Sequence, residues 1–185
     1  ISLPISDKSQ MFLDVPVGSF SQVNSTVNSM LVDEVVMLAH ETKITHALDL
    51  YSGAGNFSIP LAVNGVKVTA IEANSALVGC GRSSAREFGV ERDLAFVCSS
   101  VENYLKSNVK KETDLLILDP PRSGISNVVD RLPTAKQLLL ISCHLPSFVK
   151  DLIALRKYGW NVSYIQPFDM FPQTSYIELL TAFEK

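Results

Sequence analysis

The chain has 185 residues, with 46% hydrophobic and 19% charged side chains and a formal net charge of −3 at pH 7. That length is typical of one domain with its own core, and the composition is ordinary for a compact soluble protein. No apolar run approaches the ~20 residues that span a bilayer, and no signal peptide opens the chain. The three cysteines form neither an even disulfide set nor a metal-type pairing. We therefore expect a cytoplasmic protein with reduced thiols and no membrane partner.

The negative net charge bears on possible partners. Affinity for nucleic acid comes largely from Lys and Arg side chains that contact phosphates. The basic residues here fall in small groups, which are more typical of solvated helix faces than of a binding surface. If the protein binds nucleic acid, we expect much of the electrostatic attraction to come from outside this stretch.

Residues 1–23 are predicted to form an irregular or hairpin lead-in, punctuated by residues such as Pro4 and Gly18. The sequence starts within apolar, strand-like residues, which suggests that an upstream region of a longer protein is missing. Residues 24–185 are predicted to form one domain. Asn24 is a suitable N-cap for a first helix, because apolar residues recur after it at helical spacing.

Five short apolar strands then alternate with helices. Residues 115–118 are apolar throughout, as expected for a strand of a parallel sheet that is covered on both faces. The predicted strands are residues 46–51, 66–71, 94–98, 114–119 and 137–143, and the clearest helices are residues 75–88 and 147–157.

The tail of the chain has a different pattern. Two extended runs, residues 160–168 and 175–183, are joined by a loop of residues 169–174 that is too short for a parallel crossover. The last two strands should therefore be antiparallel. Five parallel strands followed by an antiparallel hairpin give the seven-stranded, Rossmann-like α/β sheet of the class I S-adenosylmethionine-dependent methyltransferases.

A glycine turn follows the first predicted strand. Gly53 and Gly55 allow a sharp turn whose backbone amides can approach a ligand closely. Glu72 ends the next strand, where a carboxylate can accept hydrogen bonds from both ribose hydroxyls of an adenosine. Ser58 occupies the place of the third glycine of a dinucleotide fingerprint. This difference argues against NAD and favours S-adenosylmethionine, which has no pyrophosphate.

Polar and reactive residues cluster at the predicted carboxyl ends of the strands, where ligands bind in open α/β sheets. Asp119 and Arg122 flank two prolines that either end the strand or form a stiff wall beside a flat base. Cys143 closes a strand and precedes a helix start, where the helix dipole should favour a thiolate. A cysteine is more often simply a buried small residue. Glu178 lies inside an apolar strand, where an unpaired carboxylate would be costly to bury.

These segments together resemble the catalytic domain of the RNA (uracil-5-)-methyltransferases, which form 5-methyluridine in tRNA and rRNA. Five motifs occur in the family's order over nearly the whole chain. The resemblance implies that Cys143 is the nucleophile that adds to carbon 6 of uracil and that Glu178 is the general base. It also implies an RNA substrate and an RNA-binding domain elsewhere in the full-length protein. The matching segments are residues 18–24, 49–60, 119–124, 142–143 and 171–178, and the implied S-adenosylmethionine-binding residues are Gln22, Tyr51, Gly53, Asn56, Glu72 and Asp119.

Several positions depart from the family pattern. His144 and Leu145 replace the usual Asn-Pro after the nucleophile, Tyr176 replaces a His, and Ser99 and Ser100 stand where an Asp usually faces adenine. Two alternatives therefore remain open. One is a methyltransferase of the same fold that acts on another RNA base, and the other is a non-catalytic module that binds cofactor or RNA.

Overall fold

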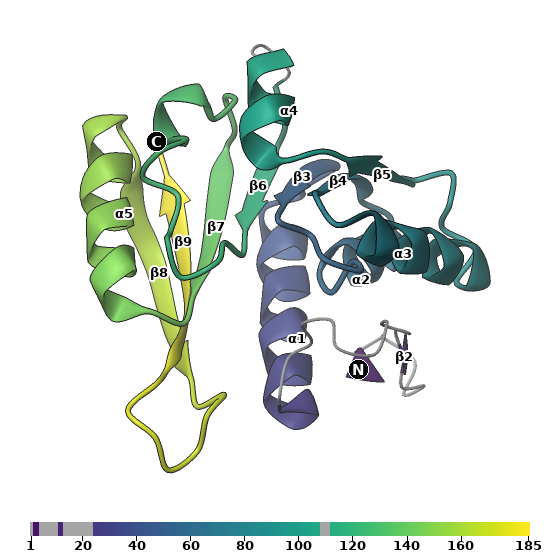
Figure 1. Ribbon diagram of the computed structural model, residues 1–185, viewed down its shortest axis with the longest axis horizontal. Helices are drawn as coiled ribbons and strands as arrows, with labels where there is room; N and C mark the ends of the chain where they lie inside the picture. Colours follow the sequence, from purple (N-terminus) through teal and green to yellow (C-terminus); the bar gives the residue numbers. More distant parts are fainter. Residues whose placement is uncertain (1, 4–10, 13–23, 108–111) are drawn as a thin grey trace.

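The computed structural model describes residues 2–3, 11–12, 24–107 and 112–185, and its centre is a seven-stranded sheet (Figure 1). The strand order is β5-β4-β3-β6-β7-β9-β8, and a separate antiparallel pair joins β1 (Ser2–Leu3) to β2 (Met11–Phe12). The sheet consists of β3 (His46–Leu50), β4 (Lys67–Glu72), β5 (Leu94–Cys98), β6 (Leu115–Leu118), β7 (Gln137–Ser142), β8 (Asn161–Phe168) and β9 (Glu178–Glu184).

Helices cover both faces of this sheet. The helices are α1 (Ser25–Glu41), α2 (Ser58–Val63), α3 (Ser75–Glu87), α4 (Val101–Ser107) and α5 (Leu145–Lys157), with a short 3-10 helix at Val129–Arg131. One core cluster joins α1, α2 and α3 to the sheet, and a second joins α4 and α5 to the opposite face. Among the described residues, no helix is long and apolar enough to cross a membrane.

The predicted topology is confirmed. Strands β3 to β7 are parallel to one another, and β9 pairs antiparallel with both β7 and β8. Asn24 is the N-cap of α1, with its side chain accepting a hydrogen bond from the Val27 backbone N–H at 3.2 Å. The last strand begins at Glu178 rather than at residue 175, because Thr174 closes a turn by donating its N–H to the Phe171 carbonyl.

Two glycines meet where α3 packs on the turn after β3. A Cβ on Gly81 would lie 2.4 Å from Cζ of Phe96, and one on Gly55 would lie 2.9 Å from the same atom. The absence of both side chains lets the helix, the turn and the aromatic ring of β5 come into contact. This contact sets how closely α3 approaches the glycine turn.

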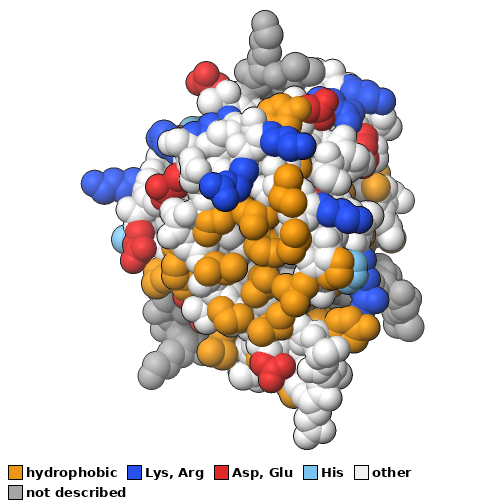
Figure 2. Space-filling view, turned by 90° about the vertical axis from the view of Figure 1, so that its left-hand side faces the viewer, with side chains coloured by type: hydrophobic (Ala, Val, Ile, Leu, Met, Phe, Trp, Pro, Cys, Tyr) orange, Lys and Arg blue, Asp and Glu red, His pale blue; other side chains and the backbone are white. Residues whose placement is uncertain are grey.

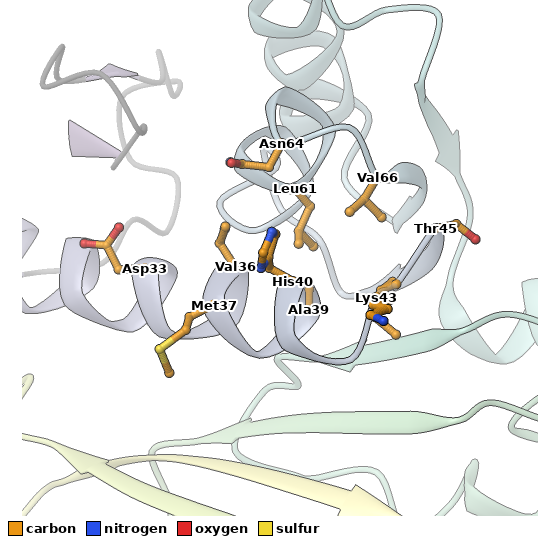
Figure 3. A pocket seen from close by; sticks show the side chains of 11 residues that line it. Asp33, Val36, Met37, Ala39, His40, Lys43, Thr45, Leu61, Asn64 and Val66 are labelled. Carbon is orange, nitrogen blue, oxygen red and sulfur yellow. The ribbon is translucent and has the colours of Figure 1, made fainter.

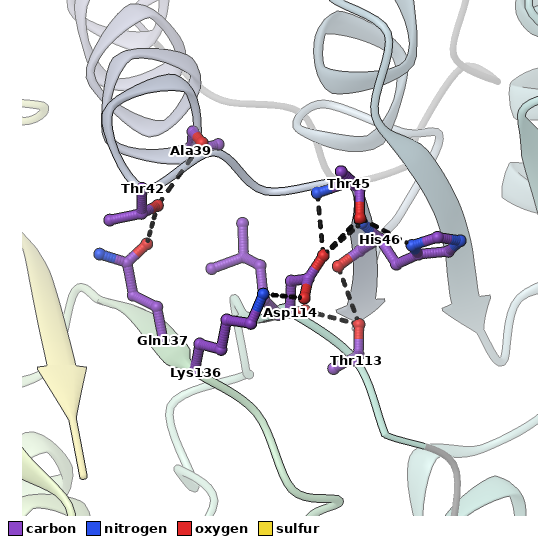
Figure 4. Close-up of polar contacts among 9 residues, drawn as sticks. Ala39, Thr42, Thr45, His46, Thr113, Asp114, Lys136 and Gln137 are labelled. Carbon is purple, nitrogen blue, oxygen red and sulfur yellow. Dashed lines mark hydrogen bonds and ion pairs between the residues drawn. The ribbon is translucent and has the colours of Figure 1, made fainter.

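A polar cluster ties the amino ends of three strands together (Figure 4). The Asp114 carboxylate pairs with the Lys136 ammonium at 2.7 Å and accepts hydrogen bonds from Thr45 N–H at 2.9 Å and from its hydroxyl at 2.7 Å. His46 N–H donates to the same carboxylate at 3.1 Å. The hydrogen bonds from Lys136 and Thr45 hold the pKa of Asp114 well below its usual range.

Exposed hydrophobic side chains gather on the surface of α5 and of β8, the strand at one edge of the sheet (Figure 2). They include Leu145, Val149 and Ile153 on successive turns of α5, and Val162 and Ile165 on β8. Lys and Arg side chains border the patch in the same view.

The packing of α3 gives a matched pair of substitutions. Gly81→Ala should lower the free energy of unfolding by about 1–3 kcal/mol, because the methyl group has no room beside Phe96. Gly79→Ala, in the same helix, should raise it by about 0.5–1 kcal/mol, because its Cβ would meet nothing within 4 Å and alanine favours helix. Urea unfolding followed by circular dichroism measures both, and equal effects would contradict this account.

The Asp114 cluster predicts a pH-dependent contribution to stability. Asp114→Asn should lower the free energy of unfolding at neutral pH by about 1 kcal/mol, since it removes the ion pair but keeps an acceptor oxygen. Because the folded pKa is depressed, the wild-type advantage is complete above the unfolded value of about 3.9 and declines as the pH falls further. Urea titrations from neutral pH to about pH 3 measure the difference.

Asp130→Asn is the matched control, because Asp130 is exposed and its carboxylate pairs with the adjacent, partly exposed Arg131 at 3.3 Å. It should leave stability unchanged at every pH. A wild-type advantage over Asp114→Asn that stays constant into acid would contradict the assigned role of Asp114.

Candidate active site

The strand register brings the sequence-predicted residues to one edge of the sheet. Leu50 pairs with Ile71 on one side and with Leu118 on the other, so Tyr51, Glu72 and Asp119 lie at the same level. Strand β9 runs antiparallel to β7, and its amino end therefore meets the carboxyl end of β7. The site is built where these strand ends meet.

Cys143 and Glu178 are neighbours for the same reason. Ser142 pairs with Leu179, which places Cys143, the residue after β7, level with Glu178, the first residue of β9. Glu178 is only 3% exposed, and its carboxylate raises the pKa of the half-buried Cys143. Two residues that are far apart in the sequence thus face each other at the sheet edge.

The glycine turn has the strained backbone that its sequence requires. Gly53 and Gly55 have φ values of +57° and +98°, and Tyr51 adopts a φ of +66°, which is unusual for a residue with a side chain. A Cβ at Gly53 would meet nothing within 4 Å, so the turn leaves open space there. Glu72 borders this space, because its Oε2 accepts the Gly53 N–H at 3.1 Å and its Oε1 accepts the Asn74 N–H at 2.7 Å.

Two pairs of hydrogen-bonded polar side chains support the glycine turn, and neither pair was predicted from the sequence. Asn56 exchanges two amide hydrogen bonds, of 2.8 and 3.0 Å, with Asn28, which is fully buried on α1. Ser58 donates its hydroxyl to the buried Asp49 carboxylate at 2.5 Å. The residue in place of a third glycine therefore binds a carboxylate under the turn. Two features of the sequence could have indicated these pairs: an Asp within an apolar strand and an Asn on the apolar face of a helix.

Burial and the repulsion between charges raise the pKa values of Asp49, Asp119 and Glu178 at this edge. Desolvation raises the pKa of Asp49 to about 7, opposed by the Ser58 hydrogen bond and increased by the charges of Asp119 and Glu72. Desolvation also raises the pKa of Asp119 to about 7. Desolvation and the Asp119 charge raise that of Glu178 to about 8. The edge can therefore hold protons near neutral pH.

The prediction that the surroundings of Cys143 favour its thiolate form is wrong. Burial raises the pKa of the thiol, and the charges of Glu178 and Asp119 raise it further. A hydrogen bond with Arg122 and the charge of that residue act in the opposite direction. The two carboxylates and the loss of hydration outweigh the helix start, so the protonated thiol is favoured.

Arg122 connects the thiol to an aromatic cluster. Its guanidinium carbon lies 5.3 Å from the centre of the Tyr176 ring, and that ring meets Phe171 edge-on, with centroids 6.2 Å apart. Tyr176 is 46% exposed. The predicted Asp-Pro-Pro-Arg segment thus runs from the half-buried Asp119 to Arg122, which lies against an exposed aromatic side chain.

Helix α5 fixes the loop that carries Arg122. Asp151 is buried on α5, and its Oδ1 accepts the Ile125 N–H at 2.9 Å. Gly124 passes over the carboxylate with a φ of +74°, and a Cβ there would lie 2.3 Å from Asp151 Oδ2. No motif in the sequence identifies Asp151 as a functional residue, because its role depends on a hydrogen bond to a loop 26 residues away.

The residues after β5 lie at the same sheet edge, next to Glu72, and one predicted residue is not described. Gln22 falls outside the described residues. Ser99 donates its N–H to the Glu72 carbonyl at 2.9 Å, and Ser100 accepts the Tyr104 N–H through its carbonyl at the start of α4. Cys98 is exposed and Cys80 is half-buried. Among the described residues, no three His, Cys, Asp or Glu side chains gather to hold a metal ion.

A groove of about 650 Å³ lies elsewhere, between the second half of α1 and the end of α2 (Figure 3). Val36, His40, Leu61 and Asn64 are among its lining residues. The lining also includes Thr45 and Val66, which directly precede β3 and β4. The groove therefore lies toward the amino ends of these strands and contains none of the predicted site residues.

The fold and the site can be compared with those of known proteins. The 23S rRNA (uracil(1939)-C(5))-methyltransferase RlmD of Marinomonas sp. (strain MWYL1) is 33% identical over 171 residues, covering 90% of this chain and 38% of that protein. The RlmD of Shewanella halifaxensis (strain HAW-EB4) is 31% identical, covering 96% of this chain and 40% of that protein. The chain thus spans about two fifths of the length of these relatives.

Solved structures of methyltransferases also superpose on this chain. The Pyrococcus abyssi tRNA (uracil-54, C5)-methyltransferase, in complex with S-adenosyl-L-homocysteine, superposes with a TM-score of 0.76 at 30% identity, covering 90% of this chain and 40% of that one. The Synechocystis magnesium protoporphyrin IX methyltransferase, with a TM-score of 0.68 and 20% identity over 90% of this chain and 87% of that one, shares the fold. The family model described as tRNA (Uracil-5-)-methyltransferase matches residues 1–185. The chain therefore belongs to the tRNA (uracil-5-)-methyltransferase family.

Proposed function

We propose that this domain transfers a methyl group from S-adenosylmethionine to carbon 5 of a uridine in RNA, through a covalent bond between Cys143 and the base. The observation that carries the proposal is the pairing of a thiol with a buried carboxyl, Glu178, at the sheet edge that also carries the glycine turn. Methyltransferases that act on the amino groups of bases do not need this pair. The names of the RlmD relatives and of the Pyrococcus abyssi enzyme support a uridine in rRNA or tRNA as the substrate.

The residues around the turn suit S-adenosylmethionine. Gly53 leaves space for an adenosine, and each oxygen of the Glu72 carboxylate accepts one backbone N–H and keeps a lone pair for a ribose hydroxyl. Asn56 is held in one orientation by Asn28, and Tyr51 and Asp119 lie at the same level of the sheet. When bound, the cofactor supplies an electrophilic methyl group. Gln22 completes the proposed binding set on family resemblance alone.

The protein side chains make carbon 5 reactive and then restore the base. The Cys143 thiol loses its proton to solvent, the thiolate sulfur forms a bond to carbon 6, and the electrons of the carbon 5–carbon 6 double bond move toward oxygen 4 as an enolate. Arg122, which contacts the thiol, is placed to stabilise this charge. After carbon 5 is methylated, the Glu178 carboxylate takes the carbon 5 proton, the double bond re-forms and the carbon–sulfur bond breaks.

The pKa values of the pair match these roles near neutral pH. Glu178, with a pKa of about 8, can both accept and release a proton without a large energy difference. The raised pKa of Cys143 limits the thiolate population, and the Arg122 contact opposes that effect. We therefore expect multiple-turnover product formation, which needs the Glu178 carboxylate to remove the carbon 5 proton, to become faster as the pH rises through the pKa of Glu178.

Substitution of each proposed reacting residue should stop the reaction at a different stage. Cys143→Ala should give neither methyl transfer nor a protein–RNA adduct, since carbon 5 is never activated. Glu178→Gln should methylate once and remain attached to RNA, because the carbon 5 proton cannot leave. The assay uses methyl-labelled cofactor with 23S rRNA or tRNA transcripts, followed by denaturing gel electrophoresis.

Cys98→Ala is the matched control, since Cys98 is exposed at the end of β5 and should be dispensable for adduct formation. Methyl transfer by Cys143→Ala would rule out the covalent mechanism. Normal turnover by Glu178→Gln would assign the base to another residue.

The charge of Glu178 should be measurable on the Cys143 thiol. In a protein carrying Cys80→Ala and Cys98→Ala, alkylation by iodoacetamide reports the Cys143 thiolate alone. Glu178→Gln should lower the pH at which alkylation is half-maximal, because a neighbouring negative charge no longer disfavours the thiolate. Glu184→Gln, at the exposed far end of the same strand, should leave it unchanged. An unchanged or higher midpoint in Glu178→Gln would contradict the assigned contact.

A further inference from the structure

We propose that Tyr176 is a stacking surface for the uracil that reacts with Cys143, with Arg122 holding its ring in place. This inference rests on the proposed function and identifies the contact that receives the base. Tyr176 lies two residues before the buried Glu178, yet 46% of it is exposed. The aromatic ring is therefore presented to the surface next to the group that must reach carbon 5.

The local backbone fixes where this ring lies. Thr174 donates its N–H and its hydroxyl to the Phe171 carbonyl, at 3.2 and 2.7 Å, and its hydroxyl oxygen accepts the Tyr176 N–H at 3.2 Å. Phe171 is packed against the core and meets the Tyr176 ring edge-on at 71°. The loop thus offers a preorganised ring, which reduces the entropy lost when a ligand binds.

Arg122 relates the ring to the nucleophile. Its guanidinium carbon lies 5.3 Å from the ring centre, and the guanidinium is near enough to the Cys143 thiol to act on its pKa, which it lowers. A planar guanidinium can stack on an aromatic face while its N–H groups donate to other atoms. The ring and the thiol are therefore separated by a single side chain, and a base that bonds to the sulfur lies within reach of the ring.

The chemistry of the substrate requires such a surface. A base that reacts at carbon 5 must leave its place in the RNA, which costs the stacking that it had there. Stacking on an aromatic side chain recovers part of this loss, typically ~1–3 kcal/mol per base. Tyr176 with Arg122 offers one aromatic face and one cation, the combination that binds unpaired bases through their π faces.

The test compares two RNA hairpins that differ only at the target position. The hairpin copies the segment around uridine 1939 of 23S rRNA or uridine 54 of tRNA, whichever the unmutated protein methylates, and carries either uracil or an abasic ribose there. Fluorescence anisotropy measures the affinity of each form. Tyr176→Ala should weaken binding of the uracil form roughly tenfold and leave binding of the abasic form unchanged.

Two variants and two measurements separate stacking from a loss of structure. Tyr176→Phe keeps the aromatic face and should bind both hairpins as the unmutated protein does. Tyr158→Ala removes a tyrosine that is equally exposed, at 49%, but lies at the far end of α5, and should have no effect. S-adenosylhomocysteine affinity and the melting temperature should be unchanged in all three variants.

The outcomes distinguish this inference from the proposed function. If Tyr176→Ala weakens both hairpins equally, or neither, while the unmutated protein still methylates the RNA, the stacking role is overturned and the proposed function stands. An unmutated protein that methylates neither RNA would instead overturn the proposed function.

Discussion

The antiparallel insertion of β9 between β7 and β8 is the constraint on which the site depends. In a purely parallel sheet, every strand would bring only its carboxyl end to this edge. Because β9 is reversed, its first residue meets the residue that follows β7, and Glu178 lies opposite Cys143. The two proposed reacting groups are thus positioned by backbone hydrogen bonds rather than by flexible loops.

The electrostatics of the edge follow from that placement. Asp49, Asp119 and Glu178 lie in or near the core at a single sheet edge, so each loses hydration and the charge of one disfavours the charge of another. Their pKa values rise toward neutrality, and the same charges raise the pKa of Cys143. Arg122 is the cation whose charge acts against this trend at the thiol. In the proposed reaction, its position would therefore affect both the thiol and the charge that develops on the base.

A layer of buried polar residues supports the groups that are proposed to bind the ligands. Asp151 holds the backbone of the loop after Arg122, and Gly124 makes room for its carboxylate. Asn28 fixes Asn56 through two amide hydrogen bonds. Each pair joins a helix to a loop, and each lets the rigid core of the sheet determine the orientation of a residue at the surface. A stacking role for Tyr176 extends the same principle to the substrate base.

The sequence alone determined the fold and most of the candidate site. Strand and helix periodicity, the length of the last loop and the Asn24 cap depend on neighbouring residues, so they could be predicted locally. The motifs likewise indicated Glu72 beside the glycine turn. The tertiary structure alone decided the pairing of Asn28 with Asn56 and the contact of Asp151 with Ile125, together with the direction of the Cys143 pKa shift. These features depend on distances and burial among residues that are remote in sequence, and hydration and charge interactions are set only when the folded chain brings them together.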